Sequence, residues 1–186
     1  MDARFPDGTE RRGSSGCVEY RAAGRRLEGY AAVFGVVARI GRFAETVLPG
    51  AFRATLASGR DVLALADHDP ARLLARTSSG SLRLAEDTRG LHFELDLPDT
   101  SLGRDMLAMA ERRDLGGMSF GFKVSPDGGE SWPTSSVREL RSVELIEISV
   151  VQAFPAYSQT SVSARSRTAG RAEAGARIRR MILESL

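Results

Sequence analysis

The sequence has little cysteine and little histidine, with one thiol, Cys17, and two imidazoles, His68 and His92. Such a set cannot form a disulfide framework or a zinc site built from Cys and His ligands, so it favours a protein made for a reducing compartment. Metal sites built from carboxylates are not excluded. At 186 residues the chain is long enough to bury its own hydrophobic core without cross-links.

Long apolar runs are also missing. The longest nearly apolar run, Tyr30 to Ala38, is about half as long as the roughly 18 residues that a membrane-spanning helix needs. Residues 1–16 mix acidic and basic side chains and contain no apolar stretch of the kind found in secretory signals. We therefore expect no membrane span and no export by that route.

Aromatic residues are scarce, at 6% of the chain, and the net charge is only +2. The charge is uneven, because six arginines and two glutamates give residues 164–186 a charge of +4 and leave −2 for the rest. An acidic body with few aromatic rings is a poor nucleic-acid surface, so nucleic acid is not an expected partner. An arginine-tailed nucleic-acid binder is kept as a competing hypothesis.

Composition divides the chain into three parts. Residues 1–16 are polar and glycine-rich without periodicity, which predicts a disordered leader. Residues 17–163 hold the strand and helix patterns of one folded domain. Residues 164–186 form a basic tail whose apolar residues recur at spacings of three and four, so the tail is either an amphipathic helix or disordered when alone.

The pattern within residues 17–163 is that of a mainly β domain with two helices inserted between strands (α+β). Helices are predicted over Ala51–Ala57 and from a Thr100 or Asp99 cap to about Arg113. The arrangement is closer to a closed Greek-key β-barrel than to alternating βαβ units. Strands are predicted over Cys17–Ala22, Arg26–Phe34, Phe43–Leu48, Val62–Ala66, Ser81–Ala85, Leu91–Leu97, Met118–Val124 and, as one long or bent strand, Val137–Gln152, with a loop over Ser125–Ser136.

A candidate nucleophile lies in Gly117-Met118-Ser119-Phe120-Gly121, which matches the G-x-S-x-G pattern of hydrolases. That motif needs a strand before the serine and a helix after it, whereas here a predicted helix precedes Ser119 and an extended segment follows. The α/β-hydrolase elbow is therefore rejected. Alternation in a strand still puts Ser119 and Gly121 on the open face, where Gly121 leaves room for a peptide substrate. The alternative is an ordinary surface serine after a glycine loop.

A serine hydroxyl needs a base to take its proton, and only two histidines are present. His68 follows a predicted apolar strand and stands between Asp67 and Asp69, at a strand end with turn residues. His92 lies inside a predicted hairpin strand, and alternation points it outward. We favour His68 as the base and regard His92 as an exposed strand residue.

The base needs a third group that fixes its tautomer and stabilises the imidazolium. Glu147 shares a strand face with apolar residues, and the other face of that strand is apolar as well, so its carboxylate is expected to be buried. A buried carboxylate is costly without a partner. That partner is either a histidine in a catalytic site or an arginine in a structural ion pair, and Asp67 and Asp69 are further candidates for the third role.

Several ordered blocks together resemble the HK97-type prohead serine proteases, which process capsid assemblies of tailed bacteriophages. The resemblance covers about Leu27 to Ser163, and each block alone would be a weak signal. The blocks are Gly29–Phe34, Glu45–Phe52, Asp67–Pro70, Gly116–Phe122, Leu145–Val151 and Pro155–Tyr157.

The resemblance implies a fold shared with herpesvirus assembly proteases, a closed β-barrel surrounded by helices. By position it makes His68 the base and Ser119 the nucleophile, and it places Glu147 in the strand that supplies the third member in the related viral enzymes. No metal or cofactor enters that chemistry. Oxyanion donors are expected among backbone N–H groups near Ala156 and Tyr157.

The function that the resemblance implies is a serine endopeptidase that cleaves the scaffolding segment of the major capsid protein, its expected partner, and also cleaves itself. It is expected to act in the bacterial host cytoplasm, inside the assembling prohead. The basic tail is then a targeting or autoprocessed segment, or a solvated end with no role, and homo-oligomerisation is left open. The alternative from another class is a catalytically inactive scaffold or core-binding protein of the same fold.

Overall fold

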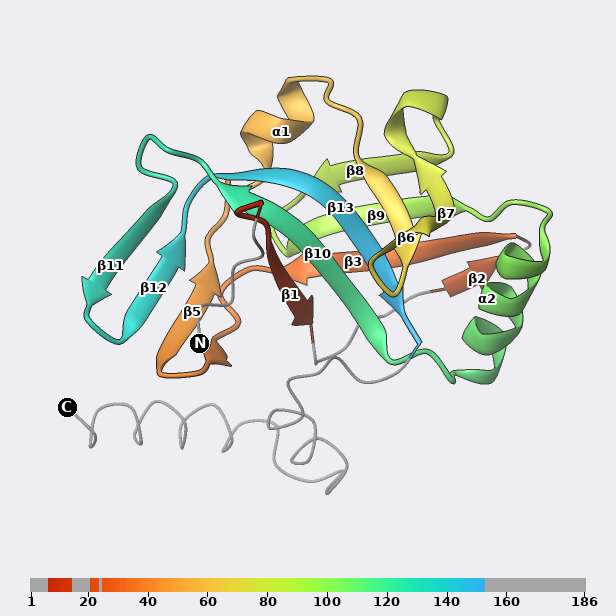
Figure 1. Cartoon of the computed structure of the whole chain (residues 1–186), viewed down its shortest axis with the longest axis horizontal. Coiled ribbons are helices and arrows are strands. Elements are labelled where there is room, and N and C mark those ends of the chain that lie inside the picture. The colour runs from red at the N-terminus through yellow and green to blue at the C-terminus, as the bar shows by residue number, and fades with distance from the viewer. Residues whose placement is uncertain (1–6, 15–20, 24, 153–186) are drawn as a thin grey trace. The chain divides into compact units, whose positions relative to one another are not determined.

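The computed structural model describes residues 7–14, 21–23 and 25–152, and these residues form a mainly β structure with a few short helices (Figure 1). The helices are α1 (Arg53–Ala57), α2 (Ser101–Arg112) and a 3-10 turn (Thr77–Ser79). No helix in this part of the chain is long and apolar enough to cross a membrane.

A five-stranded sheet carries the candidate residues and has the strand order β1-β10-β13-β6-β7. In this sheet β13 pairs antiparallel with β10 and parallel with β6, so three segments that are far apart in the sequence lie side by side (Figure 1). The strands are β1 (Glu10–Ser14), β10 (Gly117–Val124), β13 (Val143–Val151), β6 (Leu63–Ala66) and β7 (Asp69–Arg76).

The remaining described strands form two four-stranded sheets. The first, in the order β2-β3-β9-β8, has β2 (Arg21–Ala23), β3 (Arg26–Val33), β9 (Gly90–Asp96) and β8 (Leu82–Glu86). The second, in the order β11-β12-β5-β4, has β11 (Glu130–Thr134), β12 (Val137–Leu140), β5 (Phe43–Val47) and β4 (Ala38–Ile40). Strand pairing among the described residues closes none of the three sheets on itself. The mainly β prediction with inserted helices is therefore confirmed, and the closed barrel is not.

The hydrophobic core lies against one face of the five-stranded sheet. In β10, Met118, Phe120 and Phe122 are buried members of the core. The ring of Phe120 meets the ring of Phe52 edge to face, with centroids 5.5 Å apart. Because side chains alternate along a strand, the residues between these three, including Ser119, point to the opposite face.

The helix and hairpin predictions are confirmed. α2 begins after Thr100, whose hydroxyl accepts the Gly103 N–H at 3.2 Å, as expected of an N-cap. β8 and β9 pair antiparallel and form the predicted hairpin.

The strands differ from the prediction in three places. The stretch predicted as one strand over residues 137–152 is two strands, β12 and β13, which belong to different sheets. The chain turns between them at Arg141 and Ser142, whose N–H groups donate to the Gly129 carbonyl at 2.8 and 3.0 Å. The predicted loop over residues 125–136 contains β11, and the unpredicted strand β7 follows β6.

β1 lies in the segment 1–16, for which the sequence predicts disorder, so that prediction is wrong for residues 10–14. All five residues of β1 pair with β10. The strand carries Glu10, Arg11 and Arg12, and such charges are typical of a solvated segment. In the structure Glu10 and Arg12 are buried, because their partners come from distant parts of the chain.

A buried ionic cluster ties β1 to the sheet that contains β5 and β12. Arg12 donates through Nε and Nη2 to the two carboxylate oxygens of Glu45, at 2.5 and 2.9 Å. Arg138 of β12 donates to both oxygens of Glu10, at 2.6 and 2.8 Å, and to Glu45 at 2.9 Å. Arg138 Nε also donates to Glu130, at 2.5 Å. Each buried charge therefore faces an opposite charge, as a buried ion needs.

The ionic cluster makes the stability of the fold sensitive to acid. Burial alone raises the pKa of Glu10, but hydrogen bonds and charge from Arg138 and Arg12 outweigh it and lower that pKa from 4.5 to about 2. A carboxyl group with a lowered pKa stabilises the fold above its unfolded value, and this contribution is lost as pH falls from 4.5 toward 2.

We expect Glu10→Gln to lower the free energy of unfolding by about 3 kcal/mol at neutral pH, because it removes the charge that accepts buried hydrogen bonds from Arg138 and Arg12. The difference between the variant and the wild type should shrink as pH falls below 4.5, where the wild-type carboxylate also loses its charge. Urea unfolding of both proteins at neutral and acidic pH measures this difference. A difference that does not change with pH would contradict the assignment.

Candidate active site

His68 lies in a two-residue turn between β6 and β7. Asp67 and His68 have φ values of 52° and 62°, and positive φ at both central residues is the pattern of a type I′ turn. Asp and His tolerate this region better than most residues, but it still costs about 1–3 kcal/mol for each. The Asp67 carboxylate holds the turn, because it accepts from Arg72 at 2.6 Å and from the backbone and side-chain nitrogens of Gln152 at 2.8 and 2.5 Å.

The two aspartates beside His68 thus have structural partners. Asp67 binds Arg72 and Gln152, and Asp69 accepts the N–H of Ala71 at 2.9 Å. The carboxylate that the structure brings to the imidazole is that of Glu147.

Glu147 contacts both His68 and Ser149. It is 4% exposed, and its Oε1 lies 2.6 Å from His68 Nδ1. Because a carboxylate only accepts, Nδ1 carries the hydrogen of this bond. The other oxygen, Oε2, accepts from the hydroxyl of Ser149 at 2.5 Å, and the same hydroxyl accepts the backbone N–H of His68 at 3.2 Å. Ser149 therefore holds both the carboxylate and the turn that presents the histidine.

Gly121 makes room for that carboxylate. It is opposite Glu147 in the register of β10 and β13, and a Cβ at this position would lie 2.4 Å from Glu147 Oε1. Strand alternation predicts that a peptide substrate occupies the space above Gly121. In the structure the carboxylate of Glu147 fills it.

Ser119 lies on the same sheet face but is not bonded to His68. In the register of the sheet it is opposite Ser149 of β13 and Gly13 of β1. Its Oγ donates to the backbone carbonyl of Arg12 at 2.8 Å, and the residue is 2% exposed. Among the described residues no hydrogen bond joins the serine hydroxyl to the imidazole.

The structure nevertheless brings the three predicted residues to one place on the sheet. Ser119 and His68 both neighbour Ser149, the first as its cross-strand pair and the second through its backbone N–H. With Nδ1 bonded to Glu147, Nε2 is the ring nitrogen available to a hydroxyl. A carboxylate, an imidazole and a serine hydroxyl are the groups used in hydrolytic acyl transfer.

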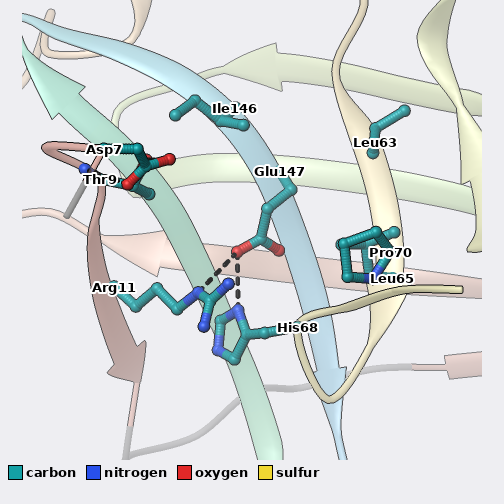
Figure 2. Close-up of a pocket in the computed structure, with 9 residues that line it drawn as sticks. All are labelled: Asp7, Thr9, Arg11, Leu63, Leu65, His68, Pro70, Ile146 and Glu147. Atoms are coloured by element: carbon teal, nitrogen blue, oxygen red, sulfur yellow. Dashed lines mark hydrogen bonds and ion pairs between the residues drawn. The ribbon is translucent and has the colours of Figure 1, made fainter. Parts of the chain in front are cut away.

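A pocket of about 390 Å³ opens beside the His68–Glu147 pair (Figure 2). Figure 2 shows Arg11 reaching from β1 over β10 toward Glu147, where its Nε lies 3.9 Å from Oε1. The pocket thus has a charged side next to an apolar one, and its volume is in the range of ligand pockets. Its other lining residues are Asp7, Thr9, Leu63, Leu65, Pro70 and Ile146.

The remaining candidate residues either lie in a different sheet from the His68–Glu147 pair or lie outside the described residues. His92 lies in β9, in a different sheet, and its ring packs on Tyr30 with centroids 5.3 Å apart. The predicted oxyanion donors near Ala156 and Tyr157, and the basic tail 164–186, lie outside the described residues. No group of three or more His, Cys, Asp and Glu side chains in the described ranges could hold a metal ion.

Sequence reasoning misses Ser149, although a signal for it exists. Ser149 stands two residues after Glu147 in β13, so alternation places both on one face. A polar pair at this spacing, in the apolar part of a strand, predicts that each satisfies the other.

Comparisons with known proteins point in one direction. A family model described as caudovirus prohead serine protease matches residues 17–173, which include His68, Ser119 and Glu147. Neither the curated proteins nor the solved structures include a match to this chain.

Proposed function

The chain belongs to the caudovirus prohead serine protease family, and on that basis we propose that it is a serine endopeptidase that cleaves the scaffolding segment of the major capsid protein as a prohead matures. The observation that carries the proposal is the 2.6 Å contact between His68 Nδ1 and the buried Glu147, on the sheet face that also bears Ser119. A strained turn holds the imidazole there, and strain of this kind clusters at functional sites.

In this proposal Ser119 is the nucleophile and His68 the base. For this step the Oγ of Ser119 has to leave the Arg12 carbonyl, to which it donates at 2.8 Å, and turn toward His68 Nε2. The bond from Oγ to the substrate carbonyl carbon forms as the proton passes to His68, and the peptide C–N bond breaks as His68 returns that proton to the leaving amine. Water then attacks the acyl-enzyme by the same route and restores the serine.

Glu147 is the third member. It fixes the tautomer of His68 by accepting from Nδ1, and its charge stabilises the imidazolium that forms during each proton transfer. Ser149 is a positioning residue, because it acts through Glu147 and the His68 backbone.

The finer parts of the proposal follow from the family. The enzyme acts in the bacterial host cytoplasm, inside the assembling prohead, with the major capsid protein as its substrate and partner, and it cleaves its own chain as well. Backbone N–H groups near Ala156 and Tyr157 are proposed as oxyanion donors, and the closed barrel of herpesvirus assembly proteases stays a prediction.

Co-expression with the cognate capsid protein tests the proposal. Intact-mass analysis should find capsid protein shortened by its scaffolding segment with the wild-type chain, and full-length capsid protein with Ser119→Ala. Fragments with both chains would assign the cleavage to another protease. Full-length capsid protein with both would favour the inactive scaffold or core-binding protein.

Gly121→Ala tests the position of the carboxylate. The added methyl group would lie 2.4 Å from Glu147 Oε1, so the carboxylate must move away from His68 while the strand itself is undisturbed. We expect kcat to fall about 10- to 100-fold, as displacement of a catalytic group by about an ångström does. Peptide-cleavage kinetics and thermal unfolding of both proteins measure it. Full activity, or loss of the fold, would contradict this reading of Gly121.

A further inference from the structure

β1 occupies the edge of the sheet beside Ser119. It is the end strand of the five-stranded sheet and pairs antiparallel with β10, from Glu10 opposite Phe122 to Ser14 opposite Met118 (Figure 1). An extended peptide that adds to a sheet edge makes the same main-chain contacts. With β1 in place, the stretch of this edge from Met118 to Phe122 is already paired.

The backbone of β1 also engages the proposed nucleophile. The Arg12 carbonyl accepts from Ser119 Oγ at 2.8 Å, and Gly13 lies opposite Ser119 in the register. A carbonyl of an extended strand thus lies next to the serine oxygen, where the carbonyl of a substrate strand would have to be. Since Ser119 is only 2% exposed, a peptide from another chain cannot reach it while this arrangement persists.

A side chain of β1 reaches the other half of the site. Arg11 is opposite Gly121 and extends toward Glu147, with its Nε 3.9 Å from the oxygen that contacts His68 (Figure 2). Its positive charge lies beside the carboxylate that is proposed to stabilise the imidazolium. If β1 left the sheet, Arg11 would leave with it, and the Glu147 carboxylate would keep its contact with His68.

If β1 leaves the sheet, the buried charges on both sides still have partners of opposite charge. Glu10 and Arg12 are an opposite pair on the strand itself, with 2.6 Å between Arg12 Nη2 and Glu10 Oε2. Arg138, which stays behind, would keep Glu45 and Glu130 as partners. Moreover, β1 precedes residues 17–173, the part of the chain that the family model matches.

We propose that β1 is an internal occupant of the substrate-strand site, and that an extended segment of the substrate binds by displacing β1 and pairing antiparallel with β10. The proposal rests on the proposed function, because it assumes that Ser119 is the nucleophile. β1 is then an autoinhibitory strand that keeps Ser119 and Glu147 engaged until a substrate segment competes for the same edge.

The rate at which a fluorophosphonate probe labels Ser119 in the full chain tests the proposal. Arg12→Gln removes the charge that binds Glu45, so it should loosen β1 and raise the labelling rate about tenfold, as the loss of charged hydrogen bonds predicts. Glu130→Gln is the matched control, because it perturbs the same cluster through Arg138 and not through β1, and it should label at the wild-type rate. Equal rates for Arg12→Gln and the control would overturn the proposal.

A reducible cross-link that fixes β1 to β10 tests the proposal in the opposite direction, because it should slow the labelling of Ser119. Ser14 and Met118 are opposite each other in the register, so Ser14→Cys with Met118→Cys, in a Cys17→Ser background, should form a disulfide under oxidised glutathione. The oxidised chain should label at least tenfold more slowly than the same chain after reduction, while Ser14→Cys alone should respond to neither treatment. Undiminished labelling of the cross-linked chain would show that β1 does not gate the site.

Hydrogen exchange separates failure of this proposal from failure of the proposed function. In Ser119→Ala mixed with the purified scaffolding segment of the capsid protein, residues 10–14 should lose amide protection while residues 117–124 keep it. Unchanged protection of residues 10–14 would overturn strand displacement, even where the wild-type chain cleaves the capsid protein. Cleavage by Ser119→Ala would instead overturn the assignment of the nucleophile.

Discussion

Adding His68→Ala to a chain that already carries Ser119→Ala should cost no further activity. Each single variant should lower kcat by a factor on the order of 10⁶, because the serine and its base work as a unit and either loss removes the acyl-enzyme route. The double variant should then cleave at the same residual rate as either single variant. Cleavage of a capsid-derived peptide, followed at enzyme concentrations high enough to measure residual rates, gives the comparison.

His92→Ala is the matched control, because it removes the other histidine of the chain, which lies in a different sheet and packs on Tyr30. It should retain the wild-type rate. If the two losses multiply in the double variant, Ser119 and His68 act in separate steps. A large loss of activity in His92→Ala would instead identify His92 as the base.

Glu147→Gln should lower kcat by about 10³- to 10⁴-fold with little change in KM. The carboxylate accepts from His68 Nδ1 on one oxygen and from Ser149 Oγ on the other. An amide has one oxygen, so its NH₂ group must face one of these two donors, and it carries no charge to stabilise the imidazolium. Steady-state kinetics on the same peptide, with thermal unfolding as a check on the fold, measures the effect.

Glu144→Gln makes the same chemical change on the same strand. The Glu144 side chain is 40% exposed and pairs with Arg60 rather than with the histidine, so its replacement should leave kcat unchanged. Similar losses in both variants would show that the effect of Glu147 is structural. Full activity of Glu147→Gln would leave His68 and Ser119 as a dyad with a different orienting group.

Local patterns in the sequence predict how the side chains of Ser119 and Glu147 lie on their strands. Alternation around Ser119 separates it from the aromatics of β10, and the structure buries Phe120 and Phe122 on the core side. The run of apolar residues around Glu147 predicts a buried carboxylate with a partner, and that partner is His68. Both inferences depend on neighbours within a few residues, which the sequence displays directly.

Features that depend on distant partners could not be predicted in this way. β1 is a run of charged residues, and only Glu45 and Arg138, far along the chain, make it a buried strand. The division of residues 137–152 between two sheets likewise depends on the Gly129 carbonyl, which binds the turn between them. Closure of a barrel is also a matter of long-range pairing, and a periodic pattern contains no information on it.

Mapping the fluorophosphonate adduct on the full chain is the most direct test of the account. Ser119 Oγ should displace fluoride and form a bond to phosphorus, so peptide mass spectrometry should find one adduct, on Ser119, and no adduct in the His68→Ala chain. An adduct on Ser149, or labelling of Ser119 that is unchanged without His68, would contradict a nucleophile activated by the His68–Glu147 pair.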